Sequence, residues 1–197
     1  MIVLVRHGRT AANAGGLLLG RADPPLDGEG TRQAAALSTV CASLDVARIV
    51  TSPLGRCRQT AAAISAAVGP SAPLEVDERW IELDYGQLDQ RPLAEIPAAT
   101  WAAWRSDVSW RPPGGESIAR LGARVRQACE ALADEARDRD VVVVSHVSPV
   151  KAAVAWALGV DDGVAWRMWV APASITRIGF TTHAPSLRAF NEVAHLA

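Results

Sequence analysis

Three short runs of consecutive, mostly apolar residues constrain the fold of this chain more than any other feature of its sequence. They are rich in β-branched side chains and cover residues 2–5, 47–51 and 141–145. Such runs, without alternating polar residues, are typical of strands covered on both faces of a mainly parallel sheet. Patterns with helical spacing lie over residues 30–44, 56–68 and 117–137. Strands that alternate with helices predict an α/β fold.

The remaining sequence indicates a single domain over residues 1–197. No internal repeat, low-complexity tract or linker divides it. A chain of 197 residues with 49% hydrophobic side chains can bury a core without disulfides or a structural metal. Residues 173–180 and 187–193 are predicted to form a terminal pair of strands. Residues 92–113, which include three tryptophans, are predicted to form a helical, lid-like insertion.

The charge and the cysteine content exclude several classes of partner and site. Twenty basic and 21 acidic residues give a net charge of −1, so a nucleic acid or an anionic membrane is not expected as a partner. No apolar run approaches the roughly 18 residues of a membrane span, and the first residues lack the pattern of a signal peptide. Three cysteines without a C-x-x-C pair indicate neither a disulfide framework nor a zinc site. We therefore expect a cytoplasmic protein.

Charged and polar side chains follow each of the three predicted strands. Arg6 and His7 end the first run, Arg56 follows the second run at the start of a helix, and His146 comes directly after the third. Ligands of parallel α/β sheets bind beyond the carboxyl ends of the strands, and the free N–H groups of a helix start favour anions. We expect these four side chains to surround one phosphate-sized cavity.

Each of these residues alone has a less specific interpretation. An Arg-His-Gly tripeptide can arise by chance, His146 can be a core histidine, and Arg56 can be an exposed surface arginine. The last alternative has weight because Lys151 is the single lysine of the chain, so arginine fills positions that lysine takes elsewhere. Only the joint occurrence of these residues at strand ends favours a site.

Other motifs for handling phosphate do not occur in the sequence. There is no G-x-x-x-x-G-K-[ST] loop and no G-x-G-x-x-G fingerprint. No cysteine has an arginine six residues later, as a cysteine phosphatase loop requires. No cluster of histidines or carboxylates suggests a catalytic metal. The sequence therefore gives no reason to expect a nucleotide cofactor or a metal.

Five ordered motifs together resemble the histidine phosphatase (phosphoglycerate mutase-like) superfamily. They are Leu4-Val-Arg-His-Gly-Arg-Thr-x-x-Asn13, Thr51-Ser-Pro-Leu-x-Arg56-x-x-Gln-Thr60, Glu82-x-Asp-Tyr-Gly86, Pro113-Gly-Gly-Glu-Ser117 and Val144-Ser-His146. The resemblance spans nearly the whole chain. It implies a three-layer α/β/α fold with a mostly parallel sheet. It also implies hydrolysis of a small phosphorylated metabolite through a phosphohistidine, without a metal or cofactor.

The same resemblance implies roles for individual residues. His7 would be the nucleophile, and Glu82 would donate a proton to the leaving oxygen. The phosphate pocket would be completed by Arg6, Arg56 and His146. Residues expected to contact the substrate are Thr10, Asn13, Arg21, Glu116 and Val147. For Arg21, a loop arginine is the simpler interpretation, and Glu116 fits equally well as a helix-start acid that complements the helix dipole.

The chemistry of phosphate ester cleavage agrees with these roles. A phosphomonoester dianion needs fixed positive donors, which two arginines and a histidine supply. Attack requires a neutral imidazole at His7, whereas His146 is expected to carry a proton, so neighbouring charges should separate their titrations. An alkoxide is a poor leaving group. A carboxyl group kept protonated by partial burial, as expected for Glu82, would supply the proton.

Departures from the superfamily pattern bear on the substrate. Val147 replaces the usual glycine, and the string from Ser145 to Lys151 resembles the α-ribazole phosphatase-like branch. Lys151 is either a substrate contact or a surface residue. Residues 86–91 lack the usual Gly-x-x-Glu-Gly pattern.

Several alternatives remain open at this point. A phosphoglycerate mutase would shift the phosphoryl group instead of releasing it, and a non-catalytic domain would only bind phosphate. The lid of the pocket is expected to draw on Trp80, Arg91 and the tryptophans of residues 101–110. The sequence leaves the oligomeric state open, and a homodimer is one option.

Overall fold

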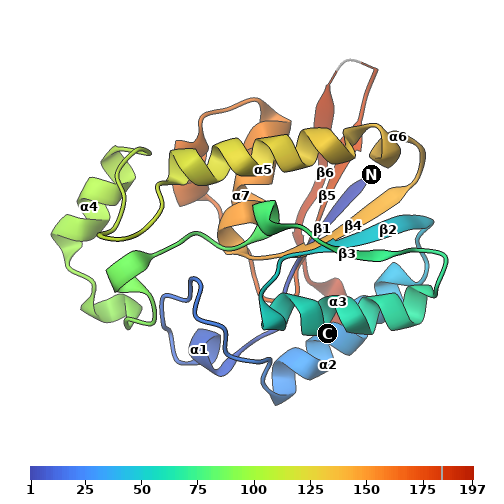
Figure 1. The fold of residues 1–197 in the computed structure, drawn as a ribbon, viewed down its shortest axis with the longest axis horizontal. Helices are drawn as coiled ribbons and strands as arrows, with labels where there is room; N and C mark the ends of the chain where they lie inside the picture. The colour runs from blue at the N-terminus through green and yellow to red at the C-terminus, as the bar shows by residue number, and fades with distance from the viewer. Residues whose placement is uncertain (183) are drawn as a thin grey trace.

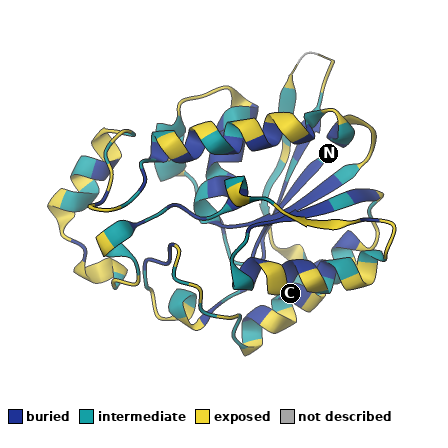
Figure 2. Cartoon of the chain, in the orientation of Figure 1, coloured by how far each residue is buried: buried dark blue, intermediate teal, exposed yellow. Residues whose placement is uncertain are grey.

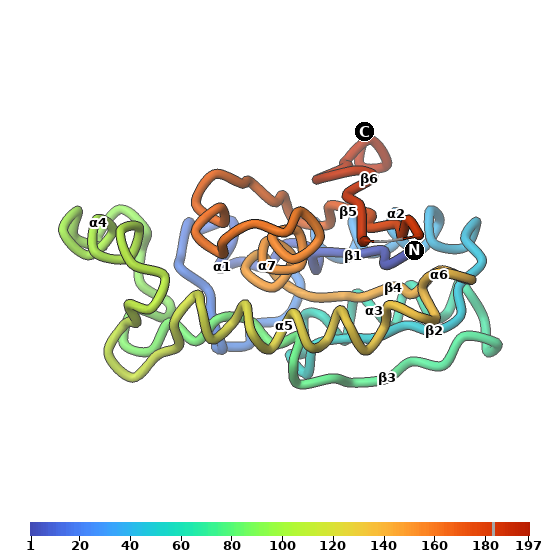
Figure 3. The backbone as a smooth tube through the Cα atoms, turned by 90° about the horizontal axis from the view of Figure 1, so that it is seen from above, coloured from blue at the N-terminus to red at the C-terminus, as the bar shows by residue number. Residues whose placement is uncertain are grey.

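A six-stranded sheet forms the centre of the molecule. The computed structural model describes residues 1–182 and 184–197, and within them the strands lie in the order β3-β2-β4-β1-β5-β6. Seen from above in Figure 3, the strands follow one another in this order. They are β1 (Ile2–Arg6), β2 (Val46–Thr51), β3 (Leu74–Val76), β4 (Asp140–Ser145), β5 (Ile175–Phe180) and β6 (Pro185–Glu192).

Helices cover both faces of this sheet (Figure 1). α5, α6 and α7 lie over one face, and α2 and α3 lie over the other. The α-helices are α1 (Ala11–Ala14), α2 (Gly28–Cys41), α3 (Gly55–Val68), α4 (Ala98–Ser106), α5 (Ile118–Ala133), α6 (Glu135–Asp138) and α7 (Val147–Leu158). Short 3-10 helices are η1 (Glu78–Trp80), η2 (Gly86–Leu88), η3 (Leu93–Glu95), η4 (Asp162–Arg167) and η5 (Ala194–Leu196).

Local sequence explains where the main helices begin and end. The Asp27 side chain accepts the Gly30 N–H at 2.7 Å at the start of α2, and Ser117 accepts the Arg120 N–H at 3.2 Å at the start of α5. α7 ends at Leu158 and is capped by Gly159, whose φ of +65° suits a residue without a side chain. The three predicted helices are present, but the last is divided into α5 and α6.

The strands carry apolar side chains on both faces. Ile2 and Leu4 of β1 point into the core under α5 and α7, whereas Val3 and Val5 point into the core under α2 and α3. All four are fully buried, and Figure 2 shows the central strands dark blue along their length. Burial on both faces, predicted from the continuous apolar runs, is confirmed.

The direction of the strands brings several chain segments to one edge of the sheet. β1, β2, β3 and β4 run parallel, whereas β5 and β6 are antiparallel to their neighbours. The predicted three-layer α/β fold with a mostly parallel sheet is confirmed, and β5 and β6 form the predicted terminal pair. The carboxyl ends of β1, β2 and β4 therefore meet at the edge that faces α1 and α4 in Figure 1.

The segment 92–113 extends beyond this edge. It contains η3 and α4, which lie at the far left of the molecule in Figures 1 and 3. The ring of Trp104 lies 5.4–5.7 Å from those of Trp101, Trp110 and Trp166, measured between centroids. Trp166 belongs to η4, so this aromatic cluster joins the segment to the region after α7.

Trp80 lies elsewhere than expected. It is fully buried beside β4, where its carbonyl accepts a hydrogen bond from the Ser145 hydroxyl at 2.7 Å. The expectation that it belongs to the lid is therefore wrong, because its ring forms part of the core under α5 and α7. Within the described residues, no helix combines the length and the apolar character needed to cross a membrane.

Candidate active site

Arg6 and His7 lie where β1 ends. The His7 N–H donates to the Ser145 carbonyl of β4 at 2.9 Å, and the His7 carbonyl accepts from Ala173 at 3.1 Å. Gly8 then passes against Gly30 of α2 so closely that a Cβ on Gly8 would clash with the Gly30 carbonyl. A glycine at this position therefore allows the chain to turn away from the sheet immediately after His7.

The hydrogen bonds of His7 fix its tautomer. Nδ1 lies 2.7 Å from the Gly8 carbonyl oxygen, and Nε2 lies 3.3 Å from Nε of Arg56. An arginine can only donate, so Nε2 is an unprotonated acceptor, and Nδ1 carries the proton. Burial, followed by the charges of Arg6 and Arg56, holds the pKa of His7 well below its ordinary value of 6.5. His7 is therefore neutral near neutral pH, as its expected role requires.

Arg56 supports His7 from the first turn of α3. Its side chain is fully buried, so the alternative of an exposed surface arginine is wrong. Nη1 donates to the Ala22 carbonyl and Nη2 to the Gly20 carbonyl, both at 2.7 Å. Asp23 lies 3.4 Å from Nη1 and supplies a counter-charge. Arg56 therefore connects His7 to the loop around residues 20–23.

His146 lies behind His7 at the end of β4. The two rings are 5.1 Å apart between centroids. Nε2 of His146 lies 2.7 Å from the Ser52 hydroxyl and 3.3 Å from the Cys57 sulfur. Burial, and then the charge of Arg56, lower the pKa of His146 well below 6.5. This contradicts the expectation of a protonated His146, because the imidazole is enclosed beside arginines.

Ser52 and Cys57 were not among the candidate residues. Ser52 lies within the Thr51-Ser-Pro motif that ends β2, and Cys57 directly follows Arg56. Both are fully buried. Their place in the second motif is a signal present in the sequence, but their contact with His146, 94 and 89 positions later, appears only in the fold.

Glu82 is a buried carboxyl group on the segment after η1. Its side chain is 3% exposed. Oε1 accepts the Leu83 N–H at 2.7 Å and the Ser148 N–H at 3.3 Å. Burial raises the pKa of Glu82 above its ordinary value, and these two hydrogen bonds oppose the rise only in part. The expected protonated carboxyl group therefore has a physical basis.

A cavity of about 340 Å³ opens beside these residues, and we call it the His7 cavity. Arg6, His7 and Glu82 line it. Arg56 and His146 are fully buried and lie beneath His7, and they are not among the lining residues. The structure thus brings the four expected phosphate-binding residues together. Arg6 and His7 lie on the wall of the cavity, whereas Arg56 and His146 lie behind it.

Three of the expected substrate contacts lie at or beside this cavity. Asn13 and Val147 line it. Thr10 is fully buried and forms a capping box with Asn13 at the start of α1, in which the Asn13 Oδ1 accepts the Thr10 N–H at 3.1 Å. Thr10 therefore holds Asn13 in place from behind the cavity wall.

Arg21 and Glu116 line a different cavity of about 480 Å³. Arg21 lies 3.3 Å from Asp84 and 3.6 Å from Glu116, and Glu116 accepts two hydrogen bonds of 2.9 Å from Arg124. Neither residue lines the His7 cavity. The structure places both in an ion-pair network beside the catalytic candidates, so it does not bring them to the substrate side of His7.

Lys151 and Trp169 border the His7 cavity as well. Lys151 projects from the first turns of α7 and forms no hydrogen bond or ion pair with the described residues. Burial lowers its pKa, and the nearby Glu82 opposes this effect. Trp169 is 72% exposed at the mouth of the cavity. No sequence motif points to Trp169, because this residue lies outside all five motifs.

Known proteins resemble this chain over nearly all of its length. Residues 2–193 match the histidine phosphatase superfamily (branch 1). The bifunctional protein Rv2228c of Mycobacterium tuberculosis is 32% identical over 200 residues, which cover 99% of this chain and 54% of that protein. A probable phosphoglycerate mutase GpmB of Yersinia enterocolitica is 32% identical over 184 residues, covering 91% and 84%. The chain spans about half the length of its mycobacterial relative.

Solved structures share the fold. The mycobacterial glucosyl-3-phosphoglycerate phosphatase Rv2419c superposes with a TM-score of 0.89 at 28% identity, over 98% of this chain and 99% of that one. A putative α-ribazole-5'-P phosphatase from Escherichia coli superposes with a TM-score of 0.84 at 26% identity, over 97% and 95%. The motifs, the fold and the match over residues 2–193 lead to one conclusion: the chain belongs to the histidine phosphatase superfamily, branch 1.

Proposed function

We propose that this protein is a metal-independent phosphomonoesterase that hydrolyses a small phosphorylated metabolite through a phosphohistidine at His7. The observation that carries the proposal is the state of His7. Its Nδ1–H is bound to the Gly8 carbonyl, its unprotonated Nε2 accepts a hydrogen bond from Arg56, and its pKa is lowered by burial and two arginines. Such a group is a neutral nucleophile held beside positive charge.

In the first step, the phosphate dianion enters the His7 cavity and pairs with Arg6. Nε2 of His7 attacks phosphorus, and the bond between phosphorus and the leaving oxygen breaks. Glu82, protonated because burial raises its pKa, transfers its proton to that oxygen. The alcohol then leaves as a neutral product, which removes the cost of expelling an alkoxide.

In the second step, water replaces the alcohol. The Glu82 carboxylate accepts a proton from the water as its oxygen attacks phosphorus, and the bond between phosphorus and Nε2 breaks. His7 returns to its starting state, and phosphate is released. A bound dianion favours the charged form of the neighbouring His146 and so opposes the lowering of its pKa in the empty site.

Related proteins support a small-metabolite substrate. Among the structural neighbours are phosphatases named for glucosyl-3-phosphoglycerate and for α-ribazole-5'-P. We include α-ribazole phosphate among the candidate substrates because the string from Ser145 to Lys151 resembles that branch. The buried, unpaired cysteines Cys41, Cys57 and Cys129 fit a reducing, cytoplasmic setting.

A phosphoglycerate mutase is the second candidate function. It is favoured by the GpmB relative, whose name is that of a probable phosphoglycerate mutase. A mutase would keep the phosphoryl group on His7 until a phosphoglycerate accepts it at another hydroxyl group. Exchange of label between the two phosphoglycerates, without release of phosphate, would identify it.

The test is hydrolysis of p-nitrophenyl phosphate and of alkyl phosphates in the presence of a chelator. We expect turnover by the wild type and loss of at least about a thousandfold in His7→Ala, because the nucleophile is gone. Glu82→Gln should lose more on alkyl esters than on the nitrophenyl ester, whose leaving group needs no proton. Arg56→Ala should lose activity, whereas the exposed Arg58→Ala and Glu95→Gln serve as matched controls.

Two results would contradict the proposal. Turnover that survives His7→Ala would remove the phosphohistidine. A folded wild-type protein that binds phosphate but hydrolyses none of the esters would favour a non-catalytic phosphate-binding domain, or a mutase if label is exchanged.

A further inference from the structure

Glu82, the proposed proton donor, lies on an irregular part of the chain. Residues 81–85 follow η1 without a helix or strand of their own. The hydrogen bonds of the Glu82 carboxyl group come from main-chain N–H groups, those of Leu83 and Ser148. The place of this carboxyl group beside His7 therefore depends on how the backbone of its own segment is held.

The side chain of Arg124, on α5, binds three carbonyl groups of this segment. Its Nη1 donates to the carbonyls of Arg79 and Ile81, both at 2.7 Å, and its Nη2 donates to the Glu82 carbonyl at 3.3 Å. The Arg124 side chain is 17% exposed, so water competes little for these bonds. The backbone of the proton donor is thereby tied to a helix that packs on the central sheet.

Glu116 fixes the orientation of the Arg124 guanidinium. Nε donates to Oε1 of Glu116 and Nη2 to Oε2, both at 2.9 Å, so the pair is bidentate. Together with the three carbonyls, these bonds use all five N–H groups of the guanidinium. A planar group bound in this way cannot rotate without breaking several hydrogen bonds, so its contacts with the segment of Glu82 are rigid.

The fourth sequence motif, residues 113–117, explains how Glu116 reaches this position. The Glu116 N–H donates to the Asp84 carbonyl at 2.8 Å. A Cβ on Gly115 would lie 2.5 Å from the same carbonyl oxygen, which is too close. Glycine at this position therefore allows the motif to lie in direct backbone contact with the segment that carries Glu82.

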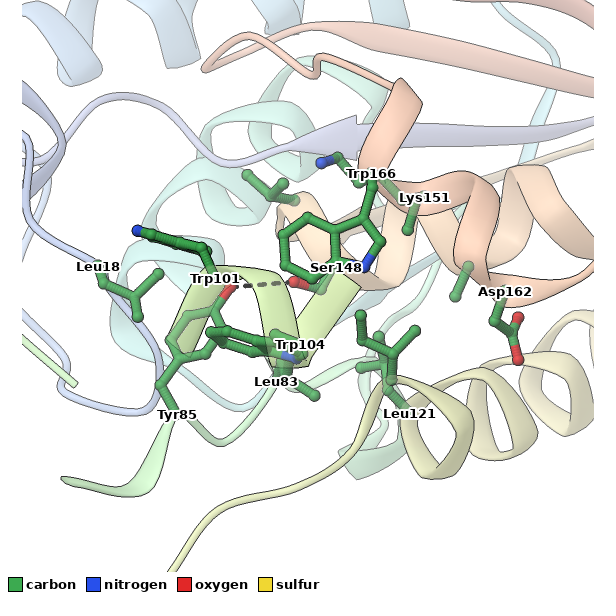
Figure 4. A pocket seen from close by; sticks show the side chains of 14 residues that line it. Leu18, Leu83, Tyr85, Trp101, Trp104, Leu121, Ser148, Lys151, Asp162 and Trp166 are labelled. Carbon is green, nitrogen blue, oxygen red and sulfur yellow. Dashed lines mark hydrogen bonds between the residues drawn. The ribbon is translucent and has the colours of Figure 1, made fainter. Parts of the chain in front are cut away.

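The far end of the segment is tied to α7. The hydroxyl groups of Tyr85 and Ser148 meet at 3.1 Å, a contact drawn as a dashed line in Figure 4. Ser148 also supplies the N–H that binds the Glu82 carboxyl group. Leu83, which lies between Glu82 and Tyr85 in the chain, lines the tryptophan-walled cavity shown in the same figure. Arg124 and Ser148 therefore hold the proton donor between α5 and α7.

We propose that Arg124 is a positioning residue for proton transfer, which sets the place of the Glu82 carboxyl group by binding the backbone of residues 79–82. The proposal rests on the phosphomonoesterase function above and adds a residue that acts through another. Arg124 lines the cavity of about 480 Å³ that contains Arg21 and Glu116, and it does not line the His7 cavity. A displaced donor lowers the rate steeply, because proton transfer requires hydrogen-bond reach of the leaving oxygen.

Lysine at position 124 separates geometry from charge. It keeps the positive charge, which together with burial contributes to the lowered pKa of His146. An ammonium group has three N–H donors and no planar fork, so it cannot bind Glu116 and three carbonyls at once. Arg126→Lys, two positions later on α5, is the matched control, because Arg126 pairs with Asp162 at 3.4 Å instead.

The ratio of kcat/KM for two esters tests the proposal. This constant covers the steps up to the first loss of the alcohol, so the later attack of water does not enter it. We expect Arg124→Lys to lower kcat/KM about thirtyfold for ethyl phosphate and at most about threefold for p-nitrophenyl phosphate, whose leaving group needs no proton. Glu116→Gln should change this ratio in the same direction but by less. Arg126→Lys should follow the wild type on both esters.

A double variant shows whether Arg124 acts through Glu82. Once Glu82→Gln has removed the proton, a further Arg124→Lys should leave the ratio between the two esters unchanged. A merely structural role would lower both esters alike. Equal losses on the two esters, or a further change of the ratio in the Glu82→Gln background, would overturn the proposal. If Arg124→Lys does not fold, Glu116→Gln takes its place in both comparisons.

A second readout is independent of activity. NMR of the carboxyl carbon of Glu82, assigned by its absence in Glu82→Gln, follows the titration of this group directly. Burial raises the pKa of Glu82 in the wild type, and we expect it to fall toward the ordinary value of 4.5 in Arg124→Lys, as water reaches the loosened segment. The pKa in Arg126→Lys should equal that of the wild type.

Failure of the phosphatase and failure of the positioning role can be told apart. If the wild type hydrolyses neither ester, the phosphatase proposal fails, and the titration alone decides whether Arg124 holds Glu82 in place. A pKa of Glu82 that is the same in Arg124→Lys and in the wild type overturns the positioning role, whether or not the protein is a phosphatase.

Discussion

At the scale of single residues, burial sets the charges at the candidate site. His7 and His146 are enclosed together with Arg6 and Arg56, and this lowers the pKa of both histidines. Glu82 is enclosed too, and the same loss of solvent raises its pKa. Burial therefore favours the neutral form of all three groups, the base form of the two histidines and the acid form of Glu82.

These shifts predict how stability depends on pH. As the pH falls below 6.5, unfolded histidines gain protons that buried His7 and His146 do not, so the free energy of unfolding should fall by up to about 1.4 kcal/mol per pH unit for each histidine. Glu82 acts in the opposite direction between 4.5 and its raised pKa, because there the folded protein holds the extra proton. Urea unfolding across this pH range measures the slope.

Two variants separate these contributions. His146→Gln should show a shallower loss of stability on acidification than the wild type, and Glu82→Gln a steeper one. The exposed Glu95→Gln should follow the wild type. An unchanged slope in His146→Gln would show that this histidine is not held neutral by the fold.

The sequence predicted residues that stand in motifs, and it did not predict their surroundings. His7, Arg6 and Glu82 line one cavity as expected, because a motif after a strand is placed by the strand. The neutral state of His146 could not be foreseen, since it depends on contacts with Arg56 and Ser52, which are far away in the chain.

At the scale of elements, one close approach fixes the loop after β1. Gly8 lies against the Gly30 carbonyl of α2, and neither residue has room for a side chain. The elements themselves were predictable because long apolar runs and helical spacing act locally. β3, with three exposed residues, and η4 lacked such signals, and their conformation depends on pairing with β2 and on packing against α5 and α7.

We predict that Gly8→Ala damages both stability and activity. The new Cβ would push the loop away from α2, at a cost of about 1–3 kcal/mol, and would displace the His7 ring through the Gly8 carbonyl that binds Nδ1. Thermal unfolding and kcat on p-nitrophenyl phosphate measure the two effects. Gly28→Ala, at the start of α2 with open space around its Cα, should be neutral or slightly stabilising. Equal behaviour of the two variants would refute the argument.

At the scale of the whole molecule, the sheet separates two cores of different composition. Nearly all tryptophans belong to or pack against the core under α5 and α7: Trp80, Trp101, Trp104, Trp110, Trp156 and Trp166. The core under α2 and α3 contains none. Tryptophan fluorescence therefore reports on one face of the sheet, whereas far-ultraviolet circular dichroism reports on both.

Because both cores share the central strands, we predict that they unfold together. Fluorescence and circular dichroism should give the same midpoint in urea for the wild type. Ile64→Ala, in the core without tryptophan, should lower the fluorescence midpoint as well, through a loss of about 2–5 kcal/mol. If Ile64→Ala lowers the urea midpoint seen by circular dichroism and leaves the fluorescence midpoint unchanged, the two faces unfold independently.

The strand order also decides when the site can exist during synthesis. β4 lies between β1 and β2, and it carries His146 at its end. A nascent chain that has left the ribosome as far as α3 already contains His7 and Arg56. It does not yet contain β4, the strand that lies between β1 and β2. His7 and its arginines can be brought together with His146 only after residue 146 has emerged, so a partly translated chain lacks the complete candidate site.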